Sequence, residues 1–406
     1  MVYQHRSLER FFNQANHQFP IILITGPRQI GKTTFLKEMA STAHTYVTLD
    51  DPLLCTLAKN EPSLFLQRFS TPLIIDEIQY APELLPFLKM KVDQDRRPGQ
   101  YWLTGSQPFP LMQGVSESLA GRIAVIKLLG FSQRELENDT QAPAFLPKHT
   151  VFSQRSMSKN FDLMQIFHRI WLGSYPALHQ ANLIDRDLFY SSYVQTYLQR
   201  DVRTLANVGD LSDFLKFIRV CAARTGQVLN LQDFCRDCDI QHTTAKRWLS
   251  VLENSGIIFL LPPYYSNLNQ RIIKSPKLYF LDTGLACWLC KWSSAESLEA
   301  GAMSGALLET WVISEILKSW WHQGLSVDLY YYRDRDGKEI DLLIEQDGEI
   351  FPIEVKKSAH PSMDAIKHFK VLEGMKLKVG LGCVLCLASQ QMPLSQSVEI
   401  VPVGIL

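Results

Sequence analysis

The sequence has no excess of charge of either sign. Lys plus Arg and Asp plus Glu number 41 each among 406 residues, so the formal net charge is zero at pH 7. A protein that coats nucleic acid non-specifically needs a broad positive field, and this balance argues against that class. A local basic patch is still compatible with it, because phosphate contacts depend on nearby charge.

Long apolar runs are absent as well. The run at 20–24 is far shorter than the ~20 residues that span a bilayer as a helix. No apolar stretch of the signal-peptide type follows the first residues. We therefore expect a cytoplasmic protein with no membrane partner.

A cysteine pattern typical of zinc is also lacking, although the chain has eight cysteines. Six of them form Cys-x-x-Cys pairs, but the first two pairs lie about 50 residues apart, beyond the usual zinc-ribbon spacing. The pairs are Cys235/Cys238, Cys287/Cys290 and Cys383/Cys386. The third pair lies in an apolar, strand-like run, where positions three apart point to opposite faces. We expect Cys383 and Cys386 to be buried hydrophobic residues.

The clearest motif that is present is Gly-Pro-Arg-Gln-Ile-Gly-Lys-Thr at 26–33. An apolar, β-branched run precedes it and a segment with helical spacing follows, which is the context that a phosphate-binding loop requires. Such a loop turns backbone N–H groups toward a phosphate at the positive end of a helix. The expected nucleotide-binding residues are Gly26, Pro27, Arg28, Gln29, Ile30, Gly31, Lys32, Thr33, Thr34 and Asp76.

The expected ligands of this site are ATP and Mg²⁺. Lys32 would reach the β- and γ-phosphates, and the Thr33 hydroxyl would bind the metal. A second apolar run at 72–75 ends in Asp76 and Glu77, and a strand that delivers carboxylates is the second half of such a site. Asp76 would bind Mg²⁺ through water, and Glu77 would act as the general base.

Two further residues are expected to act on the γ-phosphate. A third strand at 100–103 leads to Ser106, our choice for the polar sensor, with Gln107 as an alternative and a turn-forming serine as the other interpretation. Arg122 is the candidate for stabilising the transferring phosphoryl group, in cis or from a neighbouring subunit, with Arg28 second. An ordinary surface salt bridge is the alternative for Arg122.

The middle of the chain begins with a polar stretch at 136–160, which Pro143 and Pro147 interrupt, and this predicts a linker or loose loop. Helical spacing returns at 161 and at 185–205. Predicted helices at 211–224, 231–238 and 242–254, followed by strands at 257–261 and 278–281, have the order of a winged helix-turn-helix. The residues expected to reach DNA are Thr243, Thr244, Lys246, Arg247, Arg271, Lys274 and Lys277. A winged helix that serves only protein packing is the alternative.

The tail begins with a predicted helix at 305–320, followed by strands at 329–333, 339–345 and 350–356. Glu354 and Lys356 are two apart and share a face, which Asp341 on the neighbouring strand can join. Such carboxylates can hold Mg²⁺, with Glu309 as a third oxygen donor, and the lysine can stabilise developing charge. This is a layout for metal-dependent phosphodiester hydrolysis. An exposed Glu–Lys pair and a degenerate nuclease fold that only binds are the alternatives.

These segments together resemble a family of prokaryotic AAA-type ATPases with a C-terminal domain of unknown function. The resemblance is carried by 26–33, 75–79, 103–107, 119–122, 200–203, 224–227, 274–277 with 282–285, and 339–341 with 353–356. It implies ATP binding, a winged helix and a PD-(D/E)xK nuclease-like tail, and it implies no settled substrate.

We therefore expect an α/β protein. The expected parts are an AAA-type P-loop NTPase domain with a parallel sheet at 1–135, connecting helices at 136–208, a winged helix-turn-helix at 209–285 and an α/β restriction-endonuclease-like domain at 286–406. The expected function is Mg-dependent ATP hydrolysis coupled to a DNA-associated process. The alternative is a nucleotide-gated switch whose inactive tail binds DNA or a protein. A homo-oligomer is compatible with both.

Overall fold

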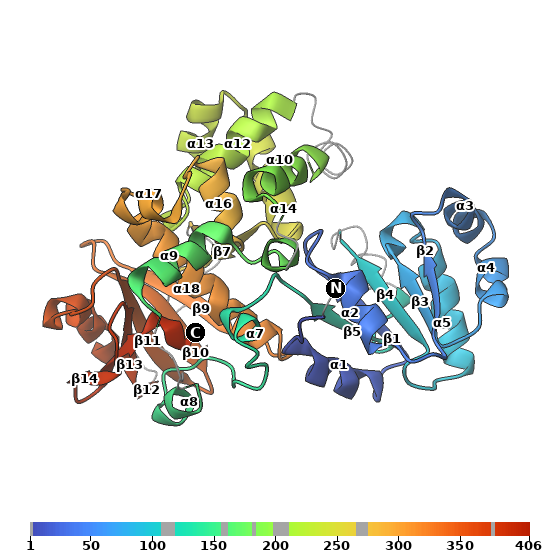
Figure 1. Cartoon of the computed structure of the whole chain (residues 1–406), viewed down its shortest axis with the longest axis horizontal. Helices are drawn as coiled ribbons and strands as arrows, with labels where there is room; N and C mark the ends of the chain where they lie inside the picture. Colours follow the sequence, from blue (N-terminus) through green and yellow to red (C-terminus); the bar gives the residue numbers. More distant parts are fainter. Residues whose placement is uncertain are drawn as a thin grey trace.

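The computed structural model describes residues 3–106, 118–155, 161–180, 184–197, 211–264, 275–374 and 378–406. Three residues singled out in the sequence, Gln107, Arg271 and Lys274, lie outside the described residues. One sheet forms the N-terminal part of the molecule and another the C-terminal part, with helices between and beside them (Figure 1). None of the described helices is long and apolar enough to cross a membrane.

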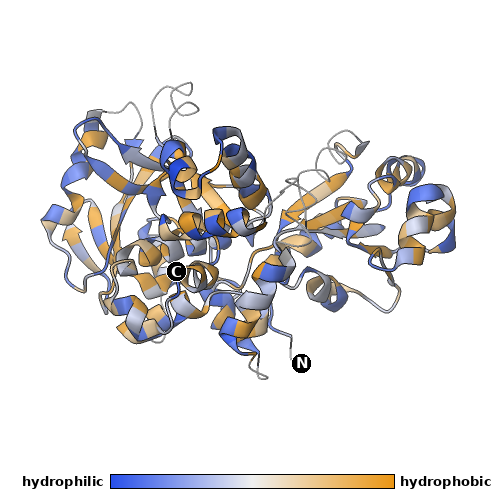
Figure 2. Cartoon of the chain, turned by 90° about the horizontal axis from the view of Figure 1, so that it is seen from above, coloured by the Kyte–Doolittle hydropathy of each residue, from blue (hydrophilic) through white to orange (hydrophobic). Residues whose placement is uncertain are grey.

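The N-terminal sheet is parallel and has the order β2-β3-β4-β1-β5. Its strands are β1 (Ile21–Thr25), β2 (Thr45–Thr48), β3 (Leu73–Asp76), β4 (Tyr101–Gly105) and β5 (Ile123–Lys127). The helical segments around it are α1 (Leu8–Asn16), α2 (Lys32–Met39), α3 (Pro52–Asn60), α4 (Pro62–Arg68), η1 (Ile78–Tyr80) and α5 (Leu84–Gln94). The apolar runs of β1, β3 and β4 are buried throughout, as expected for parallel strands covered on both faces. The hydrophobic colouring of these strands is visible in Figure 2.

The following segment contains α7 (Gln133–Leu136), α8 (His149–Gln154), α9 (Leu163–Leu172), η2 (Pro176–His179) and α10 (Arg186–Tyr197). The stretch predicted as a linker or loose loop at 136–160 has no helix or strand at 137–148 and contains the short helix α8, but it is held in place at Arg155. Arg155 is 1% exposed, and its guanidinium donates to the backbone carbonyls of Ile405, Leu406 and Pro143. A buried charge is costly unless it is hydrogen-bonded. These three hydrogen bonds therefore hold the segment in the interior.

The helices and strands predicted at 211–281 form, with the additional strand β6 between the first two helices. They are α12 (Leu211–Ala223), β6 (Gln227–Val228), α13 (Leu231–Cys238), α14 (His242–Asn254), β7 (Ile258–Leu261) and β8 (Lys277–Phe280), and the strands make an antiparallel sheet of order β6-β8-β7. The Asn230 side chain caps the start of α13, and Asp239 ends that helix in a left-handed conformation. The helices α16 (Thr283–Leu289) and α17 (Ala295–Ala300) follow.

The C-terminal part is a long helix beside a mixed sheet. Its elements are α18 (Ser304–Trp321), β9 (Asp328–Arg333), β10 (Glu339–Gln346), β11 (Glu349–Lys356), η4 (Met363–Gly374), β12 (Lys378–Val379), β13 (Gly382–Cys386), β14 (Met392–Ser395), β15 (Val398–Pro402) and η5 (Val403–Ile405). The sheet order is β14-β15-β13-β11-β10-β9, with β12 paired to β11. Cys383 and Cys386 are fully buried on β13 and carry free thiols, which confirms their interpretation as apolar residues.

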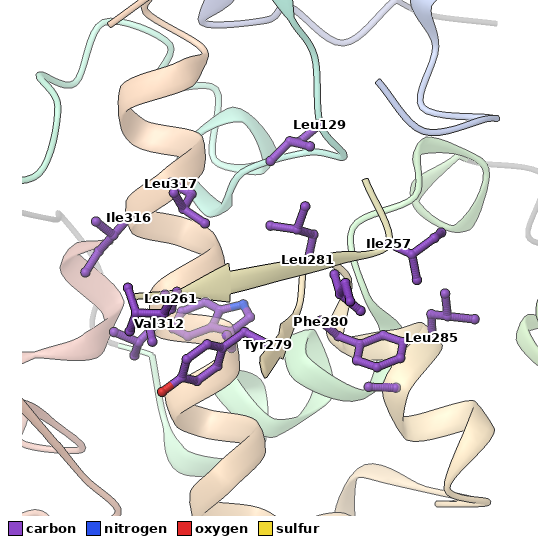
Figure 3. Packing of buried hydrophobic residues seen from close by; sticks show 14 of the residues in the cluster. Leu129, Ile257, Leu261, Tyr279, Phe280, Leu281, Leu285, Val312, Ile316 and Leu317 are labelled. Carbon is purple, nitrogen blue, oxygen red and sulfur yellow. The ribbon is translucent and has the colours of Figure 1, made fainter. Parts of the chain in front are cut away.

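The largest hydrophobic core crosses every predicted domain boundary. Figure 3 shows part of this cluster, with Leu129 from the segment after β5, Ile257 and Leu281 from around β7 and β8, and Val312 and Leu317 of α18. The same cluster includes residues from Leu8 to Leu406. A second cluster fills the other face of the N-terminal sheet. The four predicted parts therefore share one interior.

Candidate functional site

The loop at 26–33 connects β1 to α2 through a backbone that needs glycine. Gly26 has φ 146° and Gly31 has φ 88°. A Cβ on Gly26 would lie 2.0 Å from the carbonyl oxygen of Leu128, so a side chain cannot be accommodated there. Because α2 begins at Lys32, the N–H groups of its first turn are free of intrahelical partners and suit an anion.

Lys32 lies within the curve of this loop. Its ammonium group donates to the carbonyl oxygens of Gly26, at 3.0 Å, and Pro27, at 2.7 Å. The side chain is almost completely buried. Phosphate oxygens entering the loop could take over these hydrogen bonds, since the charged donor is already in place.

Asp76, at the end of β3, is the centre of a group of hydroxyls. Its carboxylate accepts from Thr33 Oγ1 at 2.9 and 3.0 Å, from Thr104 Oγ1 at 2.5 Å and from the Tyr46 hydroxyl at 2.8 Å. The structure thus brings the predicted pair Thr33 and Asp76 together. Tyr46 and Thr104 were missed, although β2 and β4 flank β3. Burial, followed by the hydrogen bond to Asp76, raises the pKa of Tyr46 and keeps it a donor.

Glu77 and Ser106 also meet. Ser106 Oγ donates to Glu77 Oε2 at 3.3 Å, and the Gln79 side-chain amide contacts both residues. Glu77 has a left-handed backbone, with φ 59°, and its N–H donates to Thr104 Oγ1 at 3.0 Å. A non-glycine residue rarely adopts this conformation, and such strain is concentrated at functional sites.

Lys32, Thr33 and Glu77 line a cavity of about 790 Å³. One side of it is formed by the loop, the start of α2 and Glu77. The other side comes from η2 and α10, more than a hundred residues further along the chain, and is formed by Pro176, Ala177, Gln180, Tyr193 and Thr196. The sequence predicted a packed helix face around Tyr193 and contained no local signal that this face closes the cavity.

The two arginine candidates lie in different places. Arg122 precedes β5, whose first residue, Ile123, pairs with Ile21 at the start of β1, whereas the phosphate loop follows the far end of β1. The Arg122 guanidinium makes two hydrogen bonds to Asp93, at 2.6 and 3.0 Å. A role in cis is therefore wrong, because the whole length of β1 separates Arg122 from the cavity. Arg28 lines the cavity and donates to the Tyr80 hydroxyl at 3.2 Å.

Most of the described residues predicted to contact DNA are accessible. Thr243, Lys246 and Arg247 are exposed and Thr244 is half-buried, all in the first half of α14. The prediction for Lys277 is wrong. This side chain is 4% exposed, with Nζ 2.5 Å from Glu339 Oε1 and 3.4 Å from Glu309 Oε1, so it cannot reach a phosphate backbone.

The tail residues gather as the strand register predicts. Asp341 lies across from Glu354, since Leu342 pairs with Ile353, and its carboxylate accepts from the Val355 N–H at 2.9 Å. Lys356 Nζ is 2.5 Å from Glu354 Oε1 and 4.0 Å from Asp341 Oδ2. We call this group, with Lys277, Tyr279, Glu309 and Glu339, the tail cluster.

The tail cluster is crowded with negative charge. Burial, followed by repulsion from Asp341, raises the pKa of Glu309 to about 7 and that of Glu354 to about 8. Among the described residues, no three His, Cys, Asp or Glu side chains are arranged so that they could hold one metal ion. The predicted role of Glu309, Asp341 and Glu354 as Mg²⁺ ligands stays a prediction.

Residues 18–137 match the family model described as an AAA domain. That range contains the parallel sheet, the phosphate loop and the three hydroxyls that donate to Asp76. This stretch is similar to AAA-type P-loop domains. Residues 164–296 and 304–406 match models described as domains of unknown function, DUF8612 and DUF4143. The stretch similar to AAA domains thus precedes two regions that match domains of unknown function.

Relatives extend this similarity along the chain. The uncharacterized proteins Mb2031c of Mycobacterium bovis and Rv2008c of Mycobacterium tuberculosis are each 27% identical over 99% of this chain and 84% of their own length. Among solved structures, the Walker-type ATPase PABY2304 of Pyrococcus abyssi is 15% identical over 71% of this chain and 96% of its own, with a TM-score of 0.42. A variant of RuvB from Thermotoga maritima is 16% identical over 63% of this chain and 86% of its own, with a TM-score of 0.28.

Proposed function

We propose that this protein is a Mg-dependent ATP hydrolase whose catalytic site is the cavity between the phosphate loop and α10. The observation that carries the proposal is the Asp76 carboxylate, which holds the Thr33 hydroxyl at 2.9 Å beside the buried Lys32. A strand-end acid joined to the first turn of the loop helix is the arrangement that binds a nucleotide triphosphate.

Thr33 and Asp76 are the residues that would hold Mg²⁺. The donor set fits this ion, because a hydroxyl and a carboxylate are hard oxygen ligands and leave room for water and phosphate oxygens. When bound, Mg²⁺ would neutralise phosphate charge. Tyr46 and Thr104 orient the Asp76 carboxylate through their hydrogen bonds.

The remaining roles, phosphate binding and proton transfer, belong to other residues of this chain. The loop N–H groups and Lys32 bind the phosphates and offset their charge. Glu77 takes the proton from the attacking water, and Ser106 and Gln79 hold its carboxylate in place. Arg28 is the arginine that lines the cavity and can approach the phosphates. Arg122 can contribute only from a neighbouring subunit.

Two substitutions test this assignment. Lys32→Ala should abolish ATP binding in calorimetry, whereas Glu77→Gln should preserve binding and lower phosphate release by roughly a hundredfold or more, since the general base is lost. Glu83→Gln is the matched control, because Glu83 is an exposed carboxylate before α5. Wild-type turnover in Glu77→Gln would refute the role of Glu77 as base.

We further propose that ATP turnover is coupled to a DNA-associated process through the exposed start of α14. The test compares DNA binding and DNA-stimulated hydrolysis in Lys246→Gln/Arg247→Gln with Lys216→Gln, which neutralises an exposed lysine of α12. Loss in the first variant alone, together with binding that weakens steeply with salt, is the expected result. Equal behaviour of both variants would contradict it.

The second candidate is a nucleotide-gated switch whose tail binds a partner without cutting it. The lysine-paired carboxylates of the tail cluster favour it over a nuclease. It predicts no nicking of plasmid in Mg²⁺ or Mn²⁺ by the wild-type protein. Nicking that disappears in Asp341→Ala would exclude this candidate.

A further inference from the structure

We propose that the Lys277 ammonium group is the resident cation of the tail cluster and keeps divalent metal ions out of it. The tail cluster is separate from the ATP cavity, and its ion pairs do not depend on ATP hydrolysis. Lys277 comes from the middle of the chain, whereas the acids that it contacts belong to the tail.

The position of Lys277 supports this assignment. Its ammonium nitrogen lies 2.5 Å from Glu339 on β10 and 3.4 Å from Glu309 on α18, inside a site where the lysine side chain is 4% exposed. Tyr279, on the same strand and the same face, donates to Glu309 at 2.5 Å. One strand therefore supplies both groups that satisfy Glu309.

The carboxylates of the tail cluster are paired with two ammonium groups. Lys277 lies between Glu309 and Glu339, and Lys356 lies between Glu354 and Asp341. A divalent ion needs several of these oxygens at roughly 2.0–2.6 Å. The oxygens of Glu309 and Glu339 that contact Lys277 cannot bind a metal ion at the same time. A divalent ion beside the ammonium group would also be repelled by its positive charge.

The strand that carries Lys277 is fixed on both sides and at its end. β8 is hydrogen-bonded to β6 and to β7. Asp282, just beyond it, accepts from the Ser174 N–H at 2.7 Å, from the Ser174 hydroxyl at 2.8 Å and from the Tyr190 hydroxyl at 2.9 Å. Lys277 is thus held among the acids by a buried strand, and its removal should leave a cavity lined by carboxylates.

The experiment measures Mn²⁺ binding to the full chain without nucleotide, by calorimetry and by the electron paramagnetic resonance signal of free Mn²⁺. The variants are Lys277→Met, which keeps the stem and removes the charge, and Lys277→Gln, which also keeps a hydrogen-bond donor. Lys277→Arg is the matched control because it preserves the charge. Asp341→Asn in the Lys277→Met background shows whether any gained binding belongs to the tail cluster.

The expected result is a Kd for Mn²⁺ that is lower by roughly tenfold or more in Lys277→Met and Lys277→Gln than in the wild type or Lys277→Arg. The gain should disappear with Asp341→Asn. Tight, Asp341-dependent binding by the wild type would overturn the proposal, because Lys277 would then exclude nothing. Weak binding by folded Lys277→Met and Lys277→Gln would also overturn it, since geometry rather than the ammonium charge would be excluding the metal.

Discussion

Thr104 gives the sharpest test of how Asp76 and Glu77, the acids of the proposed catalytic site, are held. The Thr104 hydroxyl makes two hydrogen bonds: it donates to Asp76 Oδ1 at 2.5 Å and accepts from the Glu77 N–H at 3.0 Å. Thr104 is fully buried, so water cannot replace either bond. Thr104→Val keeps the shape of the side chain and removes both.

The expected cost follows from those two bonds. Losing a hydrogen bond to a charged group costs about 1.5–3 kcal/mol, and leaving a buried N–H unpaired costs about 1–3 kcal/mol more. We therefore expect Thr104→Val to lower the free energy of unfolding by about 3 kcal/mol or more. Tyr46→Phe removes a single bond to the same carboxylate from a less buried residue and should cost about 1–2 kcal/mol.

The assay is urea unfolding followed by circular dichroism, together with ATP turnover of each variant. Thr104→Ser should recover most of the stability and activity, because it restores the hydroxyl. Thr104→Val should also lower turnover more than Tyr46→Phe, since Asp76 and Glu77 both lose a partner. A smaller effect of Thr104→Val than of Tyr46→Phe on stability would refute this account of the Asp76 cluster.

Three further outcomes are expected. Arg122→Ala should leave ATP turnover of the isolated monomer within about twofold, because the arginine lies in a surface pair; a large loss measured in steady-state phosphate release would contradict this placement. Gly256→Ala should weaken ATP binding in calorimetry, since its Cβ would lie 2.9 Å from Pro27 Cγ in the phosphate loop, whereas Gly337→Ala, which has a similar φ and no atom within 4 Å of the added carbon, should not. Burial lowers the pKa of His179 to about 4, so below about 6.5 the unfolded chain binds a proton that the folded chain does not. Stability should fall as pH drops from about 6.5 to about 4, and the decrease in the urea midpoint should be smaller in His179→Gln; an equal decrease would exclude this residue as the cause.

Local patterns in the sequence identified much of the site. The phosphate loop and the strand ending in Asp76 and Glu77 depend on neighbours along the chain. The pairing of Asp341 with Glu354 depends on side-chain alternation along two consecutive strands that form a hairpin. Periodicity and glycine placement are sufficient to indicate such features. The helices at 231–238 and 242–254 were located to the residue for the same reason.

The missed features depend on contacts between distant segments. Tyr46 reaches Asp76 because β2 lies next to β3, and Tyr193 lines the same cavity as the phosphate loop because α10 lies across from it. Lys277 has the appearance of a wing residue in the sequence, where it stands among basic and aromatic neighbours. Its burial against α18 and β10 is set by tertiary packing, which a local pattern does not encode.

The interior shared by all parts of the chain has a consequence for synthesis in the cell. Arg134 of α7, shortly after the N-terminal sheet, donates to the backbone carbonyl of Ile405 at 2.6 Å, so this segment lacks a packing partner while the ribosome translates the residues between them. At about 5–20 residues per second that interval lasts roughly 15–60 seconds. During this time the nascent chain exposes apolar surface, and we expect it to be a client of ribosome-associated chaperones.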